Sequence, residues 1–206
     1  MTARRLPAVL GVALATCAVC VATAQPVAQK PAIKVGDSWE FRRTADPEGK
    51  STEWTRTIVE LAPNDVVKVR MGDGKVSEYD SALNFMPDGL ADHARILVKY
   101  PLKVGEEWEM SRKFPNPGIA EIGKARVVAF ETITVPAGTF QCYRVEAEAS
   151  LVSRTAKEDR SWKRWYCPDI RWIAKEVLET RTHGTRSRLG SASVETSELV
   201  KFTPGN

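Results

Sequence analysis

Residues 143–151 read YRVEAEASL, and apolar and polar side chains alternate strictly along this stretch. Successive side chains of a β-strand point to opposite faces, so the alternation is typical of a strand with one buried face. Similar short runs occur along most of the chain, at residues 38–43, 53–61, 66–71, 75–80, 106–113, 125–135, 160–167, 171–182 and 193–202. The pattern predicts about ten short strands.

Turn-forming residues separate these runs. They are DPEG at 46–49, PND at 63–65, GDG at 72–74, PNPG at 115–118, PAG at 136–138, PD at 168–169 and HG at 183–184. Tight turns without interleaved helices indicate antiparallel neighbours. The predicted fold class is therefore all-β, with a meander that forms a single curved antiparallel sheet or a partly open barrel.

One segment, residues 88–98, fits two descriptions. Leu90, Ala94, Leu97 and Val98 have helical spacing behind Asp88 as a cap. The same residues also fit a loop that leads into a strand ending before the proline at position 101. We favour the loop and strand.

Two stretches nearly repeat each other, KVGDSWEF at 34–41 and KVGEEWEM at 103–110, 69 residues apart. Gly36 and Gly105 can adopt a positive φ where the chain turns into a strand. Trp39 and Trp108 supply a large apolar anchor on that strand. We interpret the pair as a two-fold internal repeat in which equivalent segments start two halves of one sheet. Independent convergence of two strand starts is the alternative.

The first 24 residues have the layout of a signal peptide. Arg4 and Arg5 precede an apolar run, and Ala22-Thr23-Ala24 forms a small-residue cleavage site. The alternative is a lipoprotein anchored at Cys17. We expect export to the periplasm after cleavage behind Ala24. Residues 1–24 are then the signal peptide, 25–35 an N-terminal lead-in and 36–203 a single antiparallel β domain.

The mature chain is nearly neutral. Of 30 basic side chains the signal peptide removes two, which leaves 28 against 26 acidic ones and a net charge of +2. Nucleic-acid binding calls for a concentrated basic stripe, so we expect no nucleic-acid partner. No later stretch is apolar for long enough to cross a bilayer, and we expect no transmembrane segment in the mature chain. Roughly 180 residues are enough for one well-buried domain.

Four ordered motifs carry a resemblance to a known family. They are YDSALNF (79–85), PLKVGEEW (101–108), VPAGTFQCYRV (135–145) and RWYCPDIRWIAKEV (164–177). They resemble a family of uncharacterised exported all-β proteins of Gram-negative bacteria, domains of unknown function with a VPAGTF turn. The resemblance implies a curved antiparallel sheet and a periplasmic location, and it brings no catalytic residues with it.

Two of the four cysteines, Cys142 and Cys167, lie beyond the signal peptide. If residues 139–152 and 158–168 form a hairpin that turns within SRTAKED (153–159), the two cysteines stand directly opposite each other. The oxidising periplasm favours a disulfide between them. The pair lacks CxxC spacing, which argues against a redox-active role.

The sequence contains no recognisable catalytic or metal-binding set. His93 and His183 are far apart, and neither belongs to an HxH or HExxH motif. GxSxG and SxxK motifs are absent. Acidic residues at Glu106, Glu107 and Glu109, and at Glu158 and Asp159, fit solvated strand faces, and a glycosidase pair requires a geometry that the sequence does not give. We expect no cofactor, no metal and no catalytic residue.

Two surfaces remain as candidates for binding. The first is a possible anion patch for lipid head groups or an anionic polymer, and the alternative is a solvated hairpin tip. Its residues are Arg181, His183, Arg186 and Arg188. The second is a possible ligand face, with core packing as its alternative. Its residues are Trp162, Trp165, Tyr166 and Trp172.

Three functions follow from this sequence, in order of preference. The first is a non-enzymatic envelope protein that binds an apolar or amphiphilic ligand, or a partner protein, on a concave sheet face. The second is a structural or interaction protein with a filled core. The third is a hydrolase, which the lack of a nucleophile, base or metal set disfavours.

Overall fold

The computed structural model describes residues 26–87, 93–114, 118–153, 157–184 and 189–206, so the predicted signal peptide and Cys17 lie outside the described residues. Eleven strands form one antiparallel sheet. Their bounds are β1 Ser38–Asp46, β2 Lys50–Ala62, β3 Val66–Met71, β4 Val76–Asp80, β5 Phe85–Met86, β6 Glu107–Lys113, β7 Ala120–Val135, β8 Gly138–Val152, β9 Lys157–Cys167, β10 Trp172–Thr182 and β11 Ser191–Thr203. The 3₁₀ turn Pro168–Ile170 connects β9 to β10, and the described residues contain no α-helix.

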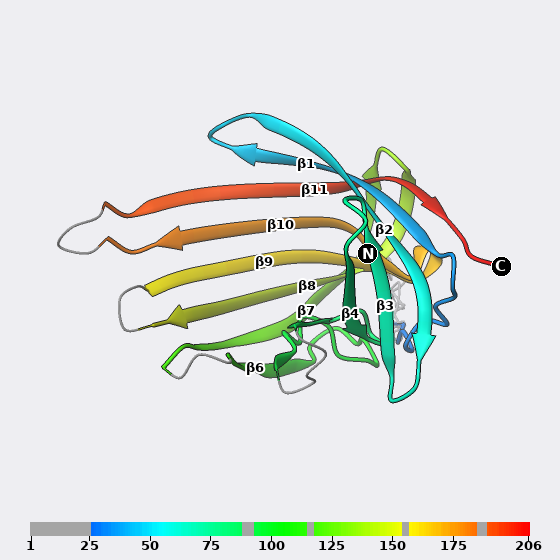
Figure 1. The fold of residues 1–206 in the computed structure, drawn as a ribbon, viewed down its shortest axis with the longest axis horizontal. Coiled ribbons are helices and arrows are strands. Elements are labelled where there is room, and N and C mark those ends of the chain that lie inside the picture. Colours follow the sequence, from blue (N-terminus) through cyan, green and yellow to red (C-terminus); the bar gives the residue numbers. More distant parts are fainter. Residues whose placement is uncertain (1–25, 88–92, 115–117, 154–156, 185–188) are drawn as a thin grey trace, which may run out of the picture.

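The strand order shows two meanders joined side by side (Figure 1). Strands β1 to β5 form one meander and β6 to β11 form the other, in the order β5-β4-β3-β2-β1-β11-β10-β9-β8-β7-β6. The joint is the pairing of β1 with β11, in which Ser38 stands opposite Thr203. The outer strands β5 and β6 are the two edges, so the described sheet does not close into a barrel. The predicted all-β antiparallel class is confirmed.

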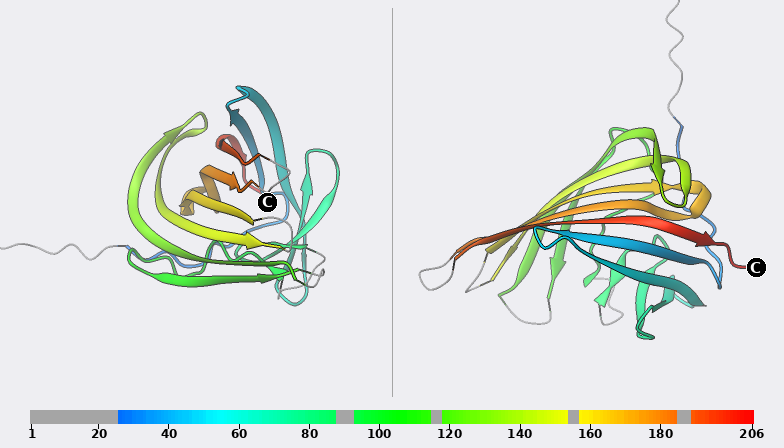
Figure 2. Two further views of the ribbon diagram at one scale, coloured as in Figure 1. Left: turned by 90° about the vertical axis from the view of Figure 1, so that its left-hand side faces the viewer. Right: turned by 90° about the horizontal axis from the view of Figure 1, so that it is seen from above.

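The sheet is strongly bent, as Figure 2 shows. Seen from one end, the β7–β8 hairpin and strands β2 to β4 lie on opposite sides of a C-shaped section. Four interruptions of the strand register contribute bulges that bend the strands locally; they lie between Glu40 and Phe41, Ile58 and Glu60, Val127 and Ala129, and Ile173 and Lys175. The buried core lies inside this curve.

The predicted strands match the observed ones with two exceptions. Strand β3 has the predicted bounds, and the other predicted runs all fall within or next to an observed strand. Strand β5 is absent from the predicted set, because two residues are too few to show alternation. The strand expected before Pro101 is wrong, since residues 94–99 have no regular secondary structure. Part of that segment, residues 88–92, lies outside the description.

The internal repeat is visible in the backbone. Gly36 has a φ of 93° and donates its N–H to the carbonyl of Ile58, at 2.8 Å. Gly105 has a φ of 95° and donates in the same way to Val127, also at 2.8 Å. In each case the second strand also has a bulge directly after the accepting residue, in its pairing with the next strand, β3 or β8. The two repeated segments therefore build equivalent hairpins, β1–β2 and β6–β7.

The segment from 93 to 102 crosses the open side of the sheet and covers part of the core. Leu97, Val98 and Leu102 are buried there. The Asn84 Oδ1 accepts the main-chain N–H groups of Leu97 at 2.9 Å and Val98 at 3.0 Å, and the Asn84 Nδ2 donates to the Val98 carbonyl. The buried Asn84 thus fixes this segment, which we call the crossing segment.

Candidate functional site

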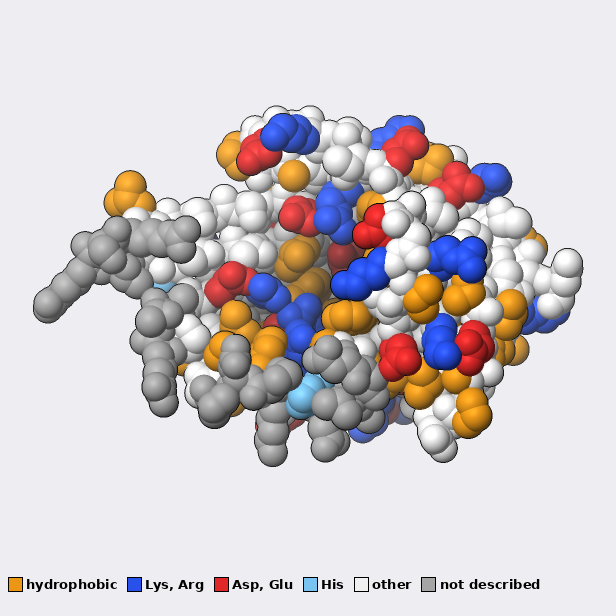
Figure 3. All heavy atoms as spheres, viewed as in Figure 1, with side chains coloured by type: hydrophobic (Ala, Val, Ile, Leu, Met, Phe, Trp, Pro, Cys, Tyr) orange, Lys and Arg blue, Asp and Glu red, His pale blue; other side chains and the backbone are white. Residues whose placement is uncertain are grey.

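The inner face of the bent sheet carries rings and charges together. Alternation along β1, β2 and β9 puts Phe41, Trp54, Arg56, Trp162 and Arg164 on this side, which we call the concave face. Figure 3 shows a hollow in the middle of the molecule, in which hydrophobic, basic and acidic side chains gather. The concave face is therefore the first candidate for a binding site.

Arg56 is the centre of this face. Its guanidinium carbon lies 4.7 Å from the ring centroid of Trp54, 5.0 Å from that of Trp172 and 5.4 Å from that of Tyr79. Cations are attracted to the faces of aromatic rings, by about 0.5–2 kcal/mol for each contact. The three rings hold the Arg56 side chain in place. None of the described carboxylates forms an ion pair with it.

The neighbouring arginines differ from Arg56 because each has a carboxylate partner. Arg43 lies 3.5 Å from a Glu195 oxygen, and Arg164 pairs with Glu176. Burial lowers the pKa of Arg56. For Arg164 burial acts in the same direction, but the pKa is raised above its usual value because Glu176 stabilises the cation. Arg56 therefore remains a half-buried cation without a carboxylate partner among the described residues.

Several N–H donors on this face have no acceptor. The Nε of Arg56, the Nε of Arg43 and the indole Nε1 atoms of Trp54 and Trp172 are shielded from solvent and have no hydrogen-bond partner among the described residues. A buried donor without an acceptor costs about 1–3 kcal/mol. The four side chains contact one another, and none of these four N–H groups has an acceptor among the described residues. We call these four residues the donor cluster.

Sequence reasoning missed Arg43, Trp54 and Arg56 as site residues. One signal was present: alternation in strand β2 puts Arg56 on the same side as Trp54 and Ile58. A basic residue between two large apolar residues of a buried face is unusual. The convergence of Tyr79 and Trp172 on it depends on strands distant in sequence, and no local pattern shows this.

The predicted ligand face is divided between two sides of the sheet. Trp162 and Tyr166 lie on the concave face and are each only 2% exposed. The crossing segment covers them, since the Arg95 guanidinium lies 5.1 Å from the Trp162 ring and the Tyr166 hydroxyl donates to the Leu97 carbonyl at 3.3 Å. Trp172 belongs to the buried ring cluster with Trp39, at 5.2 Å.

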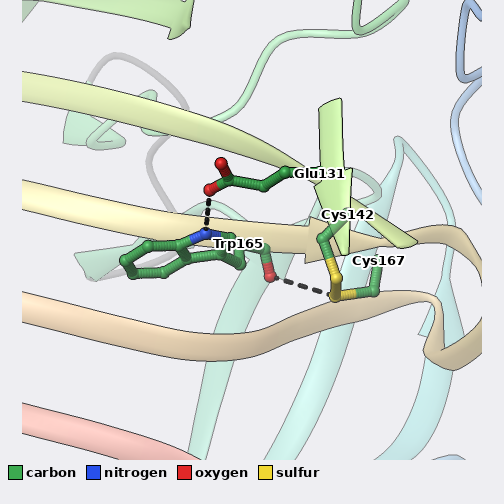
Figure 4. Close-up of a disulfide and its surroundings, with 4 residues drawn as sticks. All are labelled: Glu131, Cys142, Trp165 and Cys167. Carbon is green, nitrogen blue, oxygen red and sulfur yellow. Dashed lines mark hydrogen bonds between the residues drawn. A yellow bond between two sulfur atoms is a disulfide. The ribbon is translucent and has the colours of Figure 1, made fainter. Parts of the chain in front are cut away.

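Trp165 lies on the opposite side of β9, next to the disulfide (Figure 4). Its Nε1 donates to a Glu131 carboxylate oxygen at 2.7 Å. Tyr143 stands opposite Tyr166, which brings Cys142 and Cys167 into register as the sequence predicted, and the structure contains the disulfide between them. The disulfide joins β8 to β9 where β9 ends.

The repeat anchors are used differently. The Trp39 Nε1 donates to the Ile170 carbonyl at 2.8 Å within the core, and the half-buried Trp108 Nε1 donates to the Ile96 carbonyl of the crossing segment at 2.9 Å. Both indoles therefore fix a connecting segment to the sheet. The repeated position thus anchors a connecting segment in both copies, in two different environments.

A second charged cluster lies beside the crossing segment. The Glu121 side chain is 3% exposed, and its Oε2 accepts Nε and Nη2 of Arg95 at 3.0 and 2.9 Å. Arg112 and Arg160 approach the same carboxylate at 3.7 and 3.9 Å. One acid surrounded by three cations connects the crossing segment to β6, β7 and β9, which is a structural arrangement.

The other side of the sheet carries an open depression of about 940 Å³ near the ends of β8 to β11. Arg181 and Asp159 line it, and His183 Nε2 lies 2.5 Å from Asp159 Oδ2. Arg186 and Arg188 of the predicted anion patch lie outside the described residues. Of the two described residues of that patch, His183 is thus paired with an acid, and the role of the patch stays a prediction.

Ser150, Asp159 and His183 resemble a catalytic triad in composition only. The Ser150 hydroxyl donates to Asp159 Oδ1 at 2.5 Å, and His183 contacts the other oxygen of the same carboxylate. Nucleophilic catalysis needs the imidazole between the hydroxyl and the acid. Here the acid stands between them, so His183 has no contact through which to activate Ser150.

The described residues contain neither a metal site nor a membrane-spanning helix. No group of three or more His, Cys, Asp or Glu side chains in the described ranges is placed to hold a metal ion. Within the same ranges, no helix has both the length and the apolar character needed to cross a membrane.

Comparison with known proteins relates part of the chain to a family. A family model described as DUF3108-like matches residues 104–182, less than half of the chain but including both cysteines of the disulfide. No curated protein matches. Similar solved structures include a candidate exported protein with a YmcC-like fold from Bacteroides fragilis NCTC 9343, with TM-score 0.41, 15% identity and coverage of 85% of this chain and 99% of that chain. A second structure is a candidate lipoprotein from Parabacteroides distasonis ATCC 8503, with TM-score 0.45, 12% identity and coverage of 87% of this chain and 100% of that chain. A third is the hypothetical lipoprotein YmcC from Escherichia coli K12, with TM-score 0.43, 12% identity and coverage of 82% of this chain and 86% of that chain.

Proposed function

We propose that this chain is an exported, non-enzymatic protein of the cell envelope that binds an amphiphilic ligand on its concave face. Residues 1–24 are its signal peptide, and residues 36–203 form the one domain that carries the site. The observation that carries the proposal is the mixed surface of the concave face, where aromatic, aliphatic and charged side chains lie within reach of solvent.

Partial exposure on this face supports access for a ligand. Trp54 and Leu178 are half-buried, and the side chains of Arg43 and Glu195 are 40% and 38% exposed. Binding sites for small molecules combine apolar surface with a few placed polar groups. An amphiphile offers matching chemistry, since its chain can cover Leu178 and Trp54 while its polar end meets the arginines.

A structural role with a filled core is the second candidate, and one observation favours it. The crossing segment already occupies the concave face above Trp162 and Tyr166. A ligand would therefore bind on the part of the face that lies nearer to β1, β2 and β11. The same region would dock a partner protein in the alternative form of the proposal.

The test compares two neighbouring half-buried positions on opposite sides of strand β10. Leu178 stands opposite Trp162 on the concave face, and Val177 stands opposite Lys163 on the other face. We expect Leu178→Glu to abolish the tryptophan fluorescence change on titration with dodecyl maltoside below its micelle concentration, and Val177→Glu to retain it.

Lipid analysis of the protein purified from its own envelope provides an independent measurement. We expect a lipid to co-purify with the wild type and with Val177→Glu but not with Leu178→Glu. Absence of any amphiphile binding by the wild type would refute ligand binding and leave the structural role.

A further inference from the structure

We infer that the donor cluster of the concave face, centred on Arg56, is a binding subsite for one oxyanion, the phosphate or carboxylate group of a ligand. This inference deepens the proposed function, since it names the polar end of the amphiphile. The subsite would bind this group whatever the length of the ligand's apolar chain.

The first argument is the type of the missing partner. All four atoms of the donor cluster, on Arg43, Arg56, Trp54 and Trp172, are N–H donors. Arg164 Nε and Glu176 Oε2 of the same face are a separate case, because they pair with each other. A single water molecule accepts at most two hydrogen bonds, and its own two O–H groups would need acceptors that this cluster does not offer. An oxyanion carries acceptors alone, and it matches a cluster that offers donors alone.

The second argument is proximity. The rings of Trp54 and Trp172 both lie within 5.0 Å of the Arg56 guanidinium carbon, and Arg43 lies 5.8 Å from the Trp54 ring. The Phe41 ring stacks on Trp54 at 4.3 Å and contacts Trp172 at 5.8 Å, which fixes the two indoles relative to each other. The donors therefore belong to one preorganised group.

The third argument is charge. The face carries three arginines, Arg43, Arg56 and Arg164, against two acids, Glu176 and Glu195, and each acid is already paired with one arginine. One positive charge remains on Arg56. A half-buried cation has lost part of its hydration, and none of the described carboxylates replaces it. A bound anion supplies a counter-charge, and arginine is well suited to hold it because its fork of N–H groups fits phosphate and carboxylate oxygens.

The experiment compares three probes, dodecyl phosphate, dodecyl maltoside and inorganic phosphate, by isothermal titration below the micelle concentrations. We expect dodecyl phosphate to bind about tenfold or more tightly than dodecyl maltoside, because a charge-assisted hydrogen bond contributes that much. Arg56→Met should remove this difference. Arg70→Met, which replaces an exposed arginine of the adjacent strand β3, should preserve it.

Two controls separate anion binding from a loss of fold. Arg56→Met removes an unpaired cation but also its three ring contacts, so we expect it to unfold in one cooperative transition with a melting temperature near that of the wild type. Trp54→Phe keeps an aromatic ring beside Arg56 but removes one donor, and it should weaken dodecyl phosphate binding by about three- to tenfold. Trp165→Phe, on the opposite face, should leave it unchanged.

The outcomes distinguish this inference from the function on which it rests. Equal affinity for both dodecyl compounds, or a preference for phosphate that survives in Arg56→Met, overturns the oxyanion subsite and leaves amphiphile binding intact. Binding of inorganic phosphate that Arg56→Met abolishes, without binding of either dodecyl compound, supports the subsite and refutes the amphiphile. Similar affinities for inorganic and dodecyl phosphate identify free phosphate as the source of the anion.

Discussion

Asp37 and Glu106 occupy equivalent positions in the two hairpins, yet their surroundings differ. Asp37 is completely buried, and Arg171 Nη1 at 2.6 Å and the main-chain N–H groups of Gly205 and Lys34, both at 2.8 Å, donate to its carboxylate. Glu106 is exposed. In the first hairpin the acid thus connects the start of the strand to the C-terminal segment and to the turn before β10.

We predict that Asp37→Ala lowers the free energy of unfolding by about 3–5 kcal/mol, because Arg171 then loses its partner in a largely buried site. Glu106→Ala is the matched control and should change it by less than about 0.5 kcal/mol, as exposed substitutions usually do. Urea denaturation followed by circular dichroism measures both values. Similar costs for the two variants would contradict the asymmetry that the structure shows.

Asp159 provides a prediction about pH. The hydrogen bond from Ser150, and then that from His183, lower the pKa of Asp159 to about 2. Because the folded-state pKa lies below the unfolded one, the resulting stabilisation is present above the unfolded pKa and is lost as pH falls through about 2.

Ser150→Ala should therefore raise the pKa of Asp159 toward its ordinary value of 3.8 and move this loss of stability to higher pH. An NMR titration of the Asp159 carboxyl carbon measures the change. His183→Gln should produce a smaller rise, because the Ser150 hydrogen bond is the larger cause. An unchanged pKa in Ser150→Ala would show that this hydrogen bond does not form in solution.

At the level of elements, the hairpin of β8 and β9 was predictable in detail. Alternation located both strands, and the positions of Cys142 and Cys167 fixed the register between them. When two strands are joined by a short turn, the residues that determine their positions and register lie close together in the sequence. The short strand β5 and the crossing segment lack such information, because tertiary contacts from Asn84 and Trp108 hold the latter in place.

The disulfide of this hairpin should contribute to stability. It closes a loop with a sequence separation of 25 residues, for which the chain-entropy model gives about 3 kcal/mol. We expect the double variant Cys142→Ser/Cys167→Ser to unfold at a correspondingly lower urea concentration. The wild type measured with a reductant is the control and should behave like the double variant. A reductant-insensitive wild type would indicate that the bridge is absent in solution.

At the scale of the whole molecule, the joint between the two meanders could not be predicted. Local alternation and turns define β1 to β5 and β6 to β11, but no short-range pattern shows that Ser38 pairs with Thr203. The candidate site could not be predicted from short-range patterns either. Arg56, Tyr79 and Trp172 meet only because strands β2, β4 and β10 are brought together by the bend and by this joint.

The joint also predicts cooperative unfolding. Nine residues of β1 pair with β11, and Phe202 stacks on Trp39 at 5.7 Å across the two meanders. We expect one transition, with Trp39→Phe and Trp108→Phe each giving coincident fluorescence and circular dichroism curves, because domains of this size usually unfold in an all-or-none manner. Separate transitions would show that the two meanders are independent units.

The pairing of β1 with β11 also has a consequence for how the chain reaches this state. Strand β1 can pair with β11 only after β11 has been synthesised, because the contact spans nearly the entire described sequence. Long-range strand pairing forms slowly, and exposed strand edges are prone to aggregation in the meantime. During synthesis, the open edge of β1 is therefore the place where a chaperone would protect the unfinished molecule.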